Sequence, residues 1–61
     1  MKKLNNYKIE MQVEKNWEIL CYTNDYFWDM IFNALKEQYW KEKLRVINDK
    51  KEIIVEHEAI L

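Results

Sequence analysis

The chain has 61 residues, of which 49% are hydrophobic and 34% charged, and its formal net charge is −1. A chain of this length forms one domain that buries only about 60% of its unfolded surface, so its hydrophobic core is small. The balanced charge excludes a general electrostatic attraction to nucleic acid or anionic membranes, and no apolar run approaches the ~20 residues that span a bilayer.

Residues 1–6 come before the first patterned segment, and we expect them to form a flexible lead to a single domain that spans residues 1–61. The start, MKKLNNYK, has two lysines but no apolar segment behind them, so it lacks the pattern of a signal peptide. Cys21 is the only cysteine, which excludes a disulfide within the chain. These features together predict a cytoplasmic protein.

Residues 7–14, YKIEMQVE, alternate without a fault between apolar and polar side chains. A period of two is typical of a half-buried strand. Lys15 and Asn16 then suit a hairpin turn, because asparagine tolerates the left-handed backbone that glycine would otherwise supply. Residues 17–23, WEILCYT, are predicted to be the returning strand.

The register of this hairpin stays open. A two-residue turn pairs Met11 with Leu20, and it places Leu20 and Tyr22 on the core face. A three-residue turn pairs Met11 with Cys21 instead. Because a slip of one residue exchanges the two faces of a strand, either register leaves one set of apolar side chains on the outer side of the sheet.

A helix is predicted from about residue 25 to about residue 41. The letters TND mark its start, because Asn24 or Asp25 can cap the first turn and acidic side chains favour the positive end of the helix dipole. Lys41 and Lys43 favour the C-terminal end for the opposite reason.

The apolar residues of this helix exceed the width that a surface helix needs. At 100° per residue, one contiguous stripe is predicted to face the sheet: Phe27, Met30, Ile31, Ala34 and Leu35. Three further rings extend this stripe on one flank: Trp28, Phe32 and Tyr39. Tyr26 and Trp40 fall on the opposite, polar side.

A second hairpin is predicted after the helix. Residues 42–47, EKLRVI, alternate again, NDKK suits a turn, and EIIVEHEAI reads as a final strand. The expected pairing places Val46 opposite Ile53 and Leu44 opposite Val55, with His57 continuing the inner face. The fold class is therefore α+β: a β-β-α-β-β chain that forms a four-stranded, mainly antiparallel sheet with one helix on one face. The strand order stays open.

We find no constellation of residues that predicts catalysis, and we expect no enzyme, no cofactor and no bound metal. The chain has no serine, so its nucleophiles are Cys21 and Thr23, and His57 is its only imidazole. The sequence EHE at residues 56–58 resembles a cluster of metal ligands, but neighbouring side chains of a strand point to opposite faces. A buried or rim position is the simpler interpretation of His57.

The surplus rings have two interpretations. They fill the core if the sheet curls around the helix. Otherwise they form an interface with a partner protein or a second copy of the chain, since aromatic residues are enriched at the most important positions of interfaces. The candidate interface residues are Tyr26, Trp28, Phe32, Tyr39 and Trp40.

A basic segment provides an alternative surface. Five cations lie near the predicted helix end and the second turn: Lys41, Lys43, Arg45, Lys50 and Lys51. Cations beside a ring such as Trp40 can hold single-stranded nucleic acid. Acidic residues interleave with them, however, and a single arginine is poor equipment for recognising phosphate. Nucleic-acid binding is therefore kept as an alternative, and an acidic face that imitates DNA is disfavoured by the small net charge.

In size, composition and lack of catalytic residues, the chain resembles the very small proteins that phages and mobile elements encode to bind and block host machinery, although no motif is shared. This resemblance implies a non-enzymatic inhibitor of a bacterial host protein, for example a defence nuclease or a CRISPR effector. We also expect a homodimer, because association compensates for a small core. The alternatives are a small nucleic-acid-binding dimer and a structural or assembly component.

Overall fold

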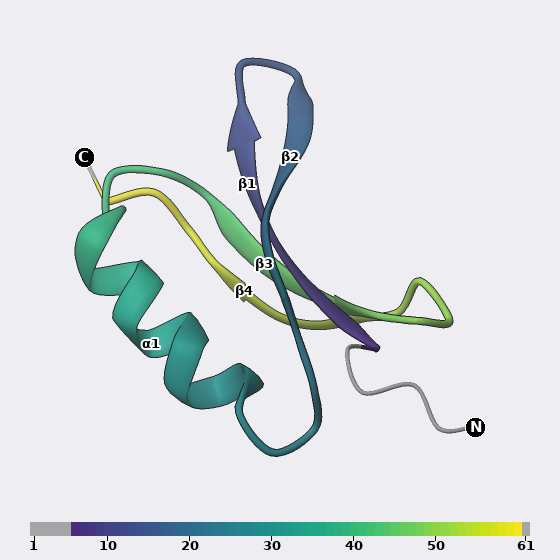
Figure 1. Cartoon of the computed structure of the whole chain (residues 1–61). Coiled ribbons are helices and arrows are strands. Elements are labelled where there is room, and N and C mark those ends of the chain that lie inside the picture. Colours follow the sequence, from purple (N-terminus) through teal and green to yellow (C-terminus); the bar gives the residue numbers. More distant parts are fainter. Residues whose placement is uncertain (1–5, 61) are drawn as a thin grey trace.

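The computed structural model describes residues 6–60 (Figure 1). Its elements are β1 (Tyr7–Val13), β2 (Asn16–Thr23), α1 (Trp28–Gln38), β3 (Leu44–Asn48) and β4 (Ile53–His57). The four antiparallel strands and the single helix confirm the predicted α+β fold and its β-β-α-β-β order. The predicted flexible lead lies outside the described residues, apart from Asn6.

The strand order is β2-β1-β3-β4. One strand from each hairpin, β1 and β3, pair in the centre of the sheet, with Ile9 opposite Val46. β2 and β4 therefore form its two edges. The helix packs against β1 and β3 and lies along one side of the sheet in Figure 1. One face of the sheet is covered by this helix, and we call the other the helix-free face.

The first hairpin turns one residue earlier than predicted. Glu14 and Lys15 form its turn, and Val13 pairs with Asn16. Glu14 has a φ of 60°, the left-handed conformation that tight hairpin turns use. Both predicted registers are therefore wrong.

A β-bulge shifts the pairing of β1 with β2 by one residue partway along this hairpin. Ile19 and Cys21 pair with adjacent residues of β1, so Leu20 is the extra residue. The two predicted registers placed either Leu20 or Cys21 inside, and the bulge lets both pack against the core. It also turns Tyr22 to the helix-free face.

The second hairpin is shifted by two residues from the predicted register, because Val46 lies opposite Val55. A shift of two keeps Val55 and His57 on the inner face, and Val55 packs against the core as predicted. A second irregularity, between Val46 and Ile47, places Ile53 opposite Ile47 on the helix-free face, so the predicted inward position of Ile53 is wrong. The shift follows from the turn, where the Asn48 side-chain oxygen accepts hydrogen bonds from the backbone N–H groups of Lys50 and Glu52, each at 2.9 Å. These local bonds determine where the strands reverse.

The helix is shorter than predicted, and turns precede and follow it. Asn24 closes the first of these, because its side-chain oxygen accepts hydrogen bonds from the backbone N–H groups of Tyr26 and Phe27 at 2.9 and 3.1 Å. Its carbonyl accepts one from the N–H of Trp28 at 3.0 Å. Asn24 thus closes the turn that leads into the helix. The helix itself begins at Trp28 with Phe27 as its N-cap and no side-chain capping bond, so the predicted cap at Asn24 or Asp25 is wrong.

The core lies between the helix and the two central strands. Ile9, Leu44 and Val46 have no exposed surface, and Phe32 closes this layer from the helix. Four other side chains of the helical segment pack around it: Trp28, Ile31, Leu35 and Tyr39.

The predicted orientation of the helix is therefore wrong. Phe32 is 3% exposed, whereas Phe27 and Met30, predicted to face the sheet, are 49% and 61% exposed. At 100° per residue, this amounts to a rotation of roughly a quarter of a turn. The physical reason is area: a buried aromatic ring removes about 150–250 Å² from water, so the side with Trp28, Phe32 and Tyr39 gains more by burial.

Candidate protein-interaction surface

Many large apolar side chains of this protein are exposed to solvent. Within residues 6–60, five hydrophobic residues are buried, whereas nine large ones are exposed. The exposed ones are Ile19, Tyr22, Tyr26, Phe27, Met30, Trp40, Ile53, Ile54 and Ile60. Single exposed apolar residues are ordinary, but clustered ones mark interaction sites.

The first cluster lies on the N-terminal half of the helical segment. We call Tyr26, Phe27, Met30 and Ala34 the helix patch, since all are exposed and are spaced for one side of a helix. Tyr26 is 84% exposed. Asn24 holds the start of this segment through its two side-chain hydrogen bonds, so the patch is built on fixed backbone.

A second, smaller cluster lies at the other end of the helix and consists of Trp40 and Ile60. The Trp40 carbonyl accepts a hydrogen bond from the Ile60 N–H at 3.1 Å, and the His57 Nε2 lies 3.2 Å from the same oxygen. The Lys41 ammonium lies 5.1 Å from the centre of the Trp40 ring. The Trp40 loop therefore holds the end of the described chain in place.

The five predicted interface residues divide between surface and interior. Tyr26 and Trp40 are exposed, whereas Phe32 is buried. Trp28 and Tyr39 are half-buried against the core, and the Trp28 ring stacks on Tyr7 with 6.3 Å between ring centres. Of the two predicted interpretations, core filling therefore holds for these three rings, because their flank of the helix is the one that meets the sheet.

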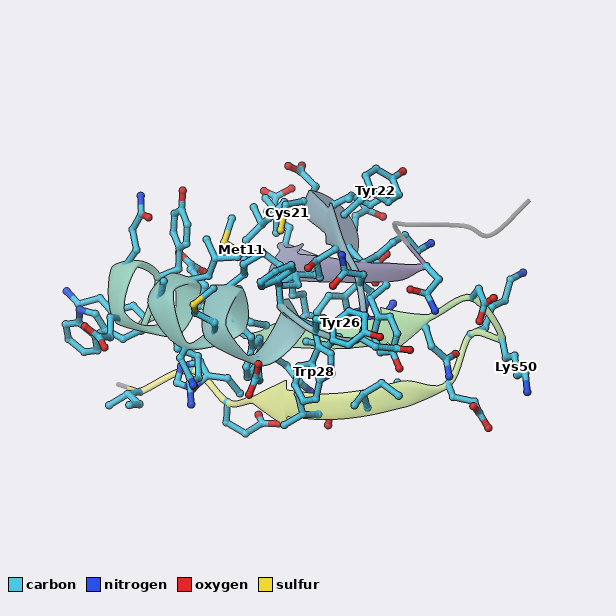
Figure 2. The ribbon with its side chains drawn as sticks, turned by 60° about the horizontal axis from the view of Figure 1, so that its bottom comes forward. Met11, Cys21, Tyr22, Tyr26, Trp28 and Lys50 are labelled. Carbon is cyan, nitrogen blue, oxygen red and sulfur yellow. The ribbon has the colours of Figure 1, made fainter. Side chains whose placement is uncertain are left out.

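Sequence reasoning missed Phe27 and Met30 as surface residues. Figure 2 shows Tyr26 and Trp28 near the start of the helix, where the exposed and the buried sides diverge. The signal that could have separated the two sides was side-chain size. The stripe with Ala34 and Met30 offers less area to bury than the stripe with three large rings.

On the helix-free face, the Arg45 side chain contacts both a carboxylate and an aromatic ring. The Arg45 Nε donates to Glu10 Oε1 at 2.8 Å, and the guanidinium lies 3.8 Å from the centre of the Trp17 ring. Lys8 Nζ lies 3.9 Å from the other Glu10 oxygen. Glu10 is only 7% exposed although no helix covers it. Its carboxylate is compensated by two cations.

The predicted basic surface does not form one patch. Lys43 precedes β3 and Lys50 follows it, so the length of this five-residue strand, roughly 17 Å at about 3.3 Å per residue, lies between them. Lys50 lies at the end of the molecule away from the C-terminal end of the helix (Figure 2). Arg45 is engaged by Glu10, and Lys43 Nζ lies 3.5 Å from Glu58 Oε2. This distribution does not favour a track for a nucleic-acid backbone.

The residues considered for catalysis are also separated. Cys21 lies on β2 and His57 on β4, which are opposite edges of the sheet. Burial raises the pKa of the Cys21 thiol, which makes it a weaker nucleophile at neutral pH. Residues 6–60 contain no group of three or more histidine, cysteine or acidic side chains placed to hold a metal ion. Over the same residues, no helix is long and apolar enough to cross a membrane.

Comparisons with protein-family models, with curated proteins and with solved structures find no match to this chain. What the protein does is therefore inferred from its own surface. The most distinctive property of that surface is the helix patch, because it is apolar, ordered and left uncovered by the sheet.

Proposed function

We propose that this chain is a non-enzymatic protein-binding protein, and that the helix patch is its main contact surface. The observation that supports this proposal is the large number of exposed apolar side chains, nine within residues 6–60, in a chain with only five buried hydrophobic residues. Leaving apolar area in water costs about 25 cal/mol per Å², so a partner that covers it gains that free energy. The fold does not use these side chains for its own core.

The chemistry of the patch suits a groove on another protein. An amphipathic helix binds such a groove through anchors three and four residues apart, which is the spacing of Tyr26, Phe27 and Met30. Methionine adapts its shape to an apolar pocket, and tyrosine combines a large apolar ring with a polar hydroxyl.

The proposed partner is a bacterial host protein that the chain binds and blocks in the cytoplasm, such as a defence nuclease or a CRISPR effector. Its support is the resemblance in size and composition to the small inhibitors of phages and mobile elements. Binding through apolar contacts, with a net charge of only −1, is expected to depend little on salt.

The experiment compares the affinity of a captured host protein for wild type, Met30→Lys and Ile53→Lys by calorimetry. Met30 and Ile53 are 61% and 51% exposed, so both variants are expected to stay folded. We expect Met30→Lys to weaken binding about thirtyfold or more, as at an interface hot spot, and Ile53→Lys to leave it unchanged.

The same titration at low and high salt separates this proposal from nucleic-acid binding. Binding of DNA or RNA that falls steeply with salt, and that is lost when Lys41 and Lys43 are replaced, would support the alternative function. Equal affinity of wild type and Met30→Lys for the protein partner would refute the helix patch as the contact surface.

A further inference from the structure

The two edges of the sheet differ in how well they are protected from pairing with another strand. β4 has five residues, and charged side chains surround it: Lys50, Lys51 and Glu52 before it, and Glu56 and Glu58 within or after it. Short length and charge are the usual protection of an edge strand. The chain after β4 is also held by the Trp40 carbonyl through Ile60.

β2 lacks most of this protection. It has eight residues, and Glu18 is its only charged one. It contains no lysine and no proline. The bulge at Leu20 is its one irregularity, and it leaves the stretch from Asn16 to Ile19 regular.

The side chains of β2 add an apolar row beside this open edge. Trp17, Ile19 and Tyr22 share the helix-free face, since each lies opposite a residue of β1 that points there. Ile19 is 43% exposed and Tyr22 more than half. Figure 2 shows Tyr22 projecting outward at the top of the view.

We propose that two copies of this chain pair β2 with β2, antiparallel and across a twofold axis, to join two four-stranded sheets into one of eight strands. Antiparallel pairing of a strand with itself is compatible with the twofold symmetry of most dimers. The proposal uses a surface separate from the helix patch, so either proposal can fail without the other.

Charge complementarity at the ends of β2 identifies a second copy as the occupant. Lys15 lies directly before β2, and Asp25 lies two residues after it. When two β2 strands overlap antiparallel over their full length, with Leu20 of each copy at the twofold axis, Lys15 of each copy comes to the end where Asp25 of the other copy lies. The two side chains are exposed, and neither forms an ion pair within residues 6–60. The Asp25 carboxylate does interact with the Tyr7 hydroxyl of its own copy. The symmetry creates this attraction twice, whereas an unrelated strand would supply it only by coincidence.

The first test is sedimentation equilibrium of wild type, Ile19→Lys, Ile53→Lys and Met30→Lys from micromolar to millimolar concentration. Ile19 and Ile53 are similarly exposed isoleucines on opposite edge strands, 43% and 51%, so they form a matched pair. We expect the wild type to dimerise, Ile19→Lys to raise the dimer dissociation constant about tenfold or more, and Ile53→Lys to leave it unchanged.

The second test reverses the charges. Lys15→Glu alone and Asp25→Lys alone place like charges at both ends of the seam, and each is expected to weaken the dimer about tenfold. An equimolar mixture of these two variants regains both attractions, so it should dimerise more strongly than either variant does by itself. A charge effect outside this seam would not produce that recovery.

Four results would overturn the proposal. They are a monomeric wild type at millimolar concentration, a dimer lost with Ile53→Lys but kept with Ile19→Lys, a dimer lost only with Met30→Lys, and a mixture of charge variants no more dimeric than its components. The second result would assign the seam to β4, and the third would assign it to the helix patch. Circular dichroism of each variant checks that it remains folded.

Discussion

The two faces of the sheet bury their side chains in different ways. On the helix-covered face, Ile9, Leu44 and Val46 lose all exposure because a second layer, centred on Phe32, lies over them. The stabilising term there is the removal of apolar area from water. Packing against a second layer is dense, so a missing side chain leaves a cavity.

On the helix-free face, Glu10 and Ile47 are nearly as buried without any second layer. Arg45 lies over the Trp17 ring and binds Glu10, so the long side chains of the sheet cover one another. Similar burial thus has two physical causes, and the two faces should respond differently to mutation. Loss of a core ring creates a cavity, whereas loss of Arg45 leaves a carboxylate with less compensation.

The largest loss of stability is expected for a mutation in the core under the helix-covered face. Phe32→Ala should lower the free energy of unfolding by about 3–5 kcal/mol, because it removes a buried ring. A domain of this length is stable by only about 3–9 kcal/mol, so the variant should be largely unfolded or close to it. Urea denaturation followed by circular dichroism measures the difference.

Phe27→Ala is the matched control, since Phe27 is the same residue type in the same helical segment but half exposed. It should cost about 1 kcal/mol or less. Equal losses for Phe27→Ala and Phe32→Ala would mean that the helix does not have the orientation described above.

An intermediate loss of stability is expected when a side chain of the helix-free face is changed. Arg45→Met keeps an apolar stem over Trp17 but removes the charge from Glu10, and it should cost about 1–2 kcal/mol. Lys43→Met breaks the more exposed pair with Glu58 and should cost less than about 0.5 kcal/mol. Both are measured by urea denaturation.

The double variant Glu10→Gln/Arg45→Met sharpens this result. It removes both charges, so it should recover part of the stability that Arg45→Met loses. If Arg45→Met is as stable as the wild type, the apolar stem alone organises this face and the ion pair contributes nothing.

The smallest effect concerns Cys21, which lies on the helix-covered face near the β2 edge. Burial raises the pKa of its thiol, so the folded chain keeps this proton at a pH where the unfolded chain loses it. The resulting stabilisation is fully present below the unfolded pKa and disappears as the pH rises through the folded pKa. The free energy of unfolding should therefore decrease above the ordinary thiol range.

Tyr7 contributes in the same direction, because the Asp25 carboxylate, as hydrogen-bond acceptor, is the main cause that raises its pKa. The difference between wild type and Cys21→Ala, measured from pH 8 to 10, isolates the thiol. Alkylation of Cys21 at pH 8 should also be several times slower in the native protein than in urea. Equal rates in both would show that the thiol is not protected by the fold.

Much of the fold follows from local patterns in the sequence. The alternation over residues 7–14 and 42–47 predicted strands, and Asn24 lies in the turn that leads into the predicted helix. Both patterns are short-range, because side-chain period and turn chemistry depend on a few neighbouring residues. Tyr26 and Trp40 were also identified from the helical wheel as lying away from the sheet, and both are exposed.

The tertiary structure decided how these elements fit together. The bulge at Leu20, the central pairing of β1 with β3 and the rotation of the helix that exposes Phe27 and Met30 all involve residues distant in the sequence. A periodic pattern shows that an element has an apolar side, but two adjacent apolar sides compete, and the winner is the one that buries more area against the actual sheet. That competition left the helix patch uncovered, and only the packed structure could reveal it.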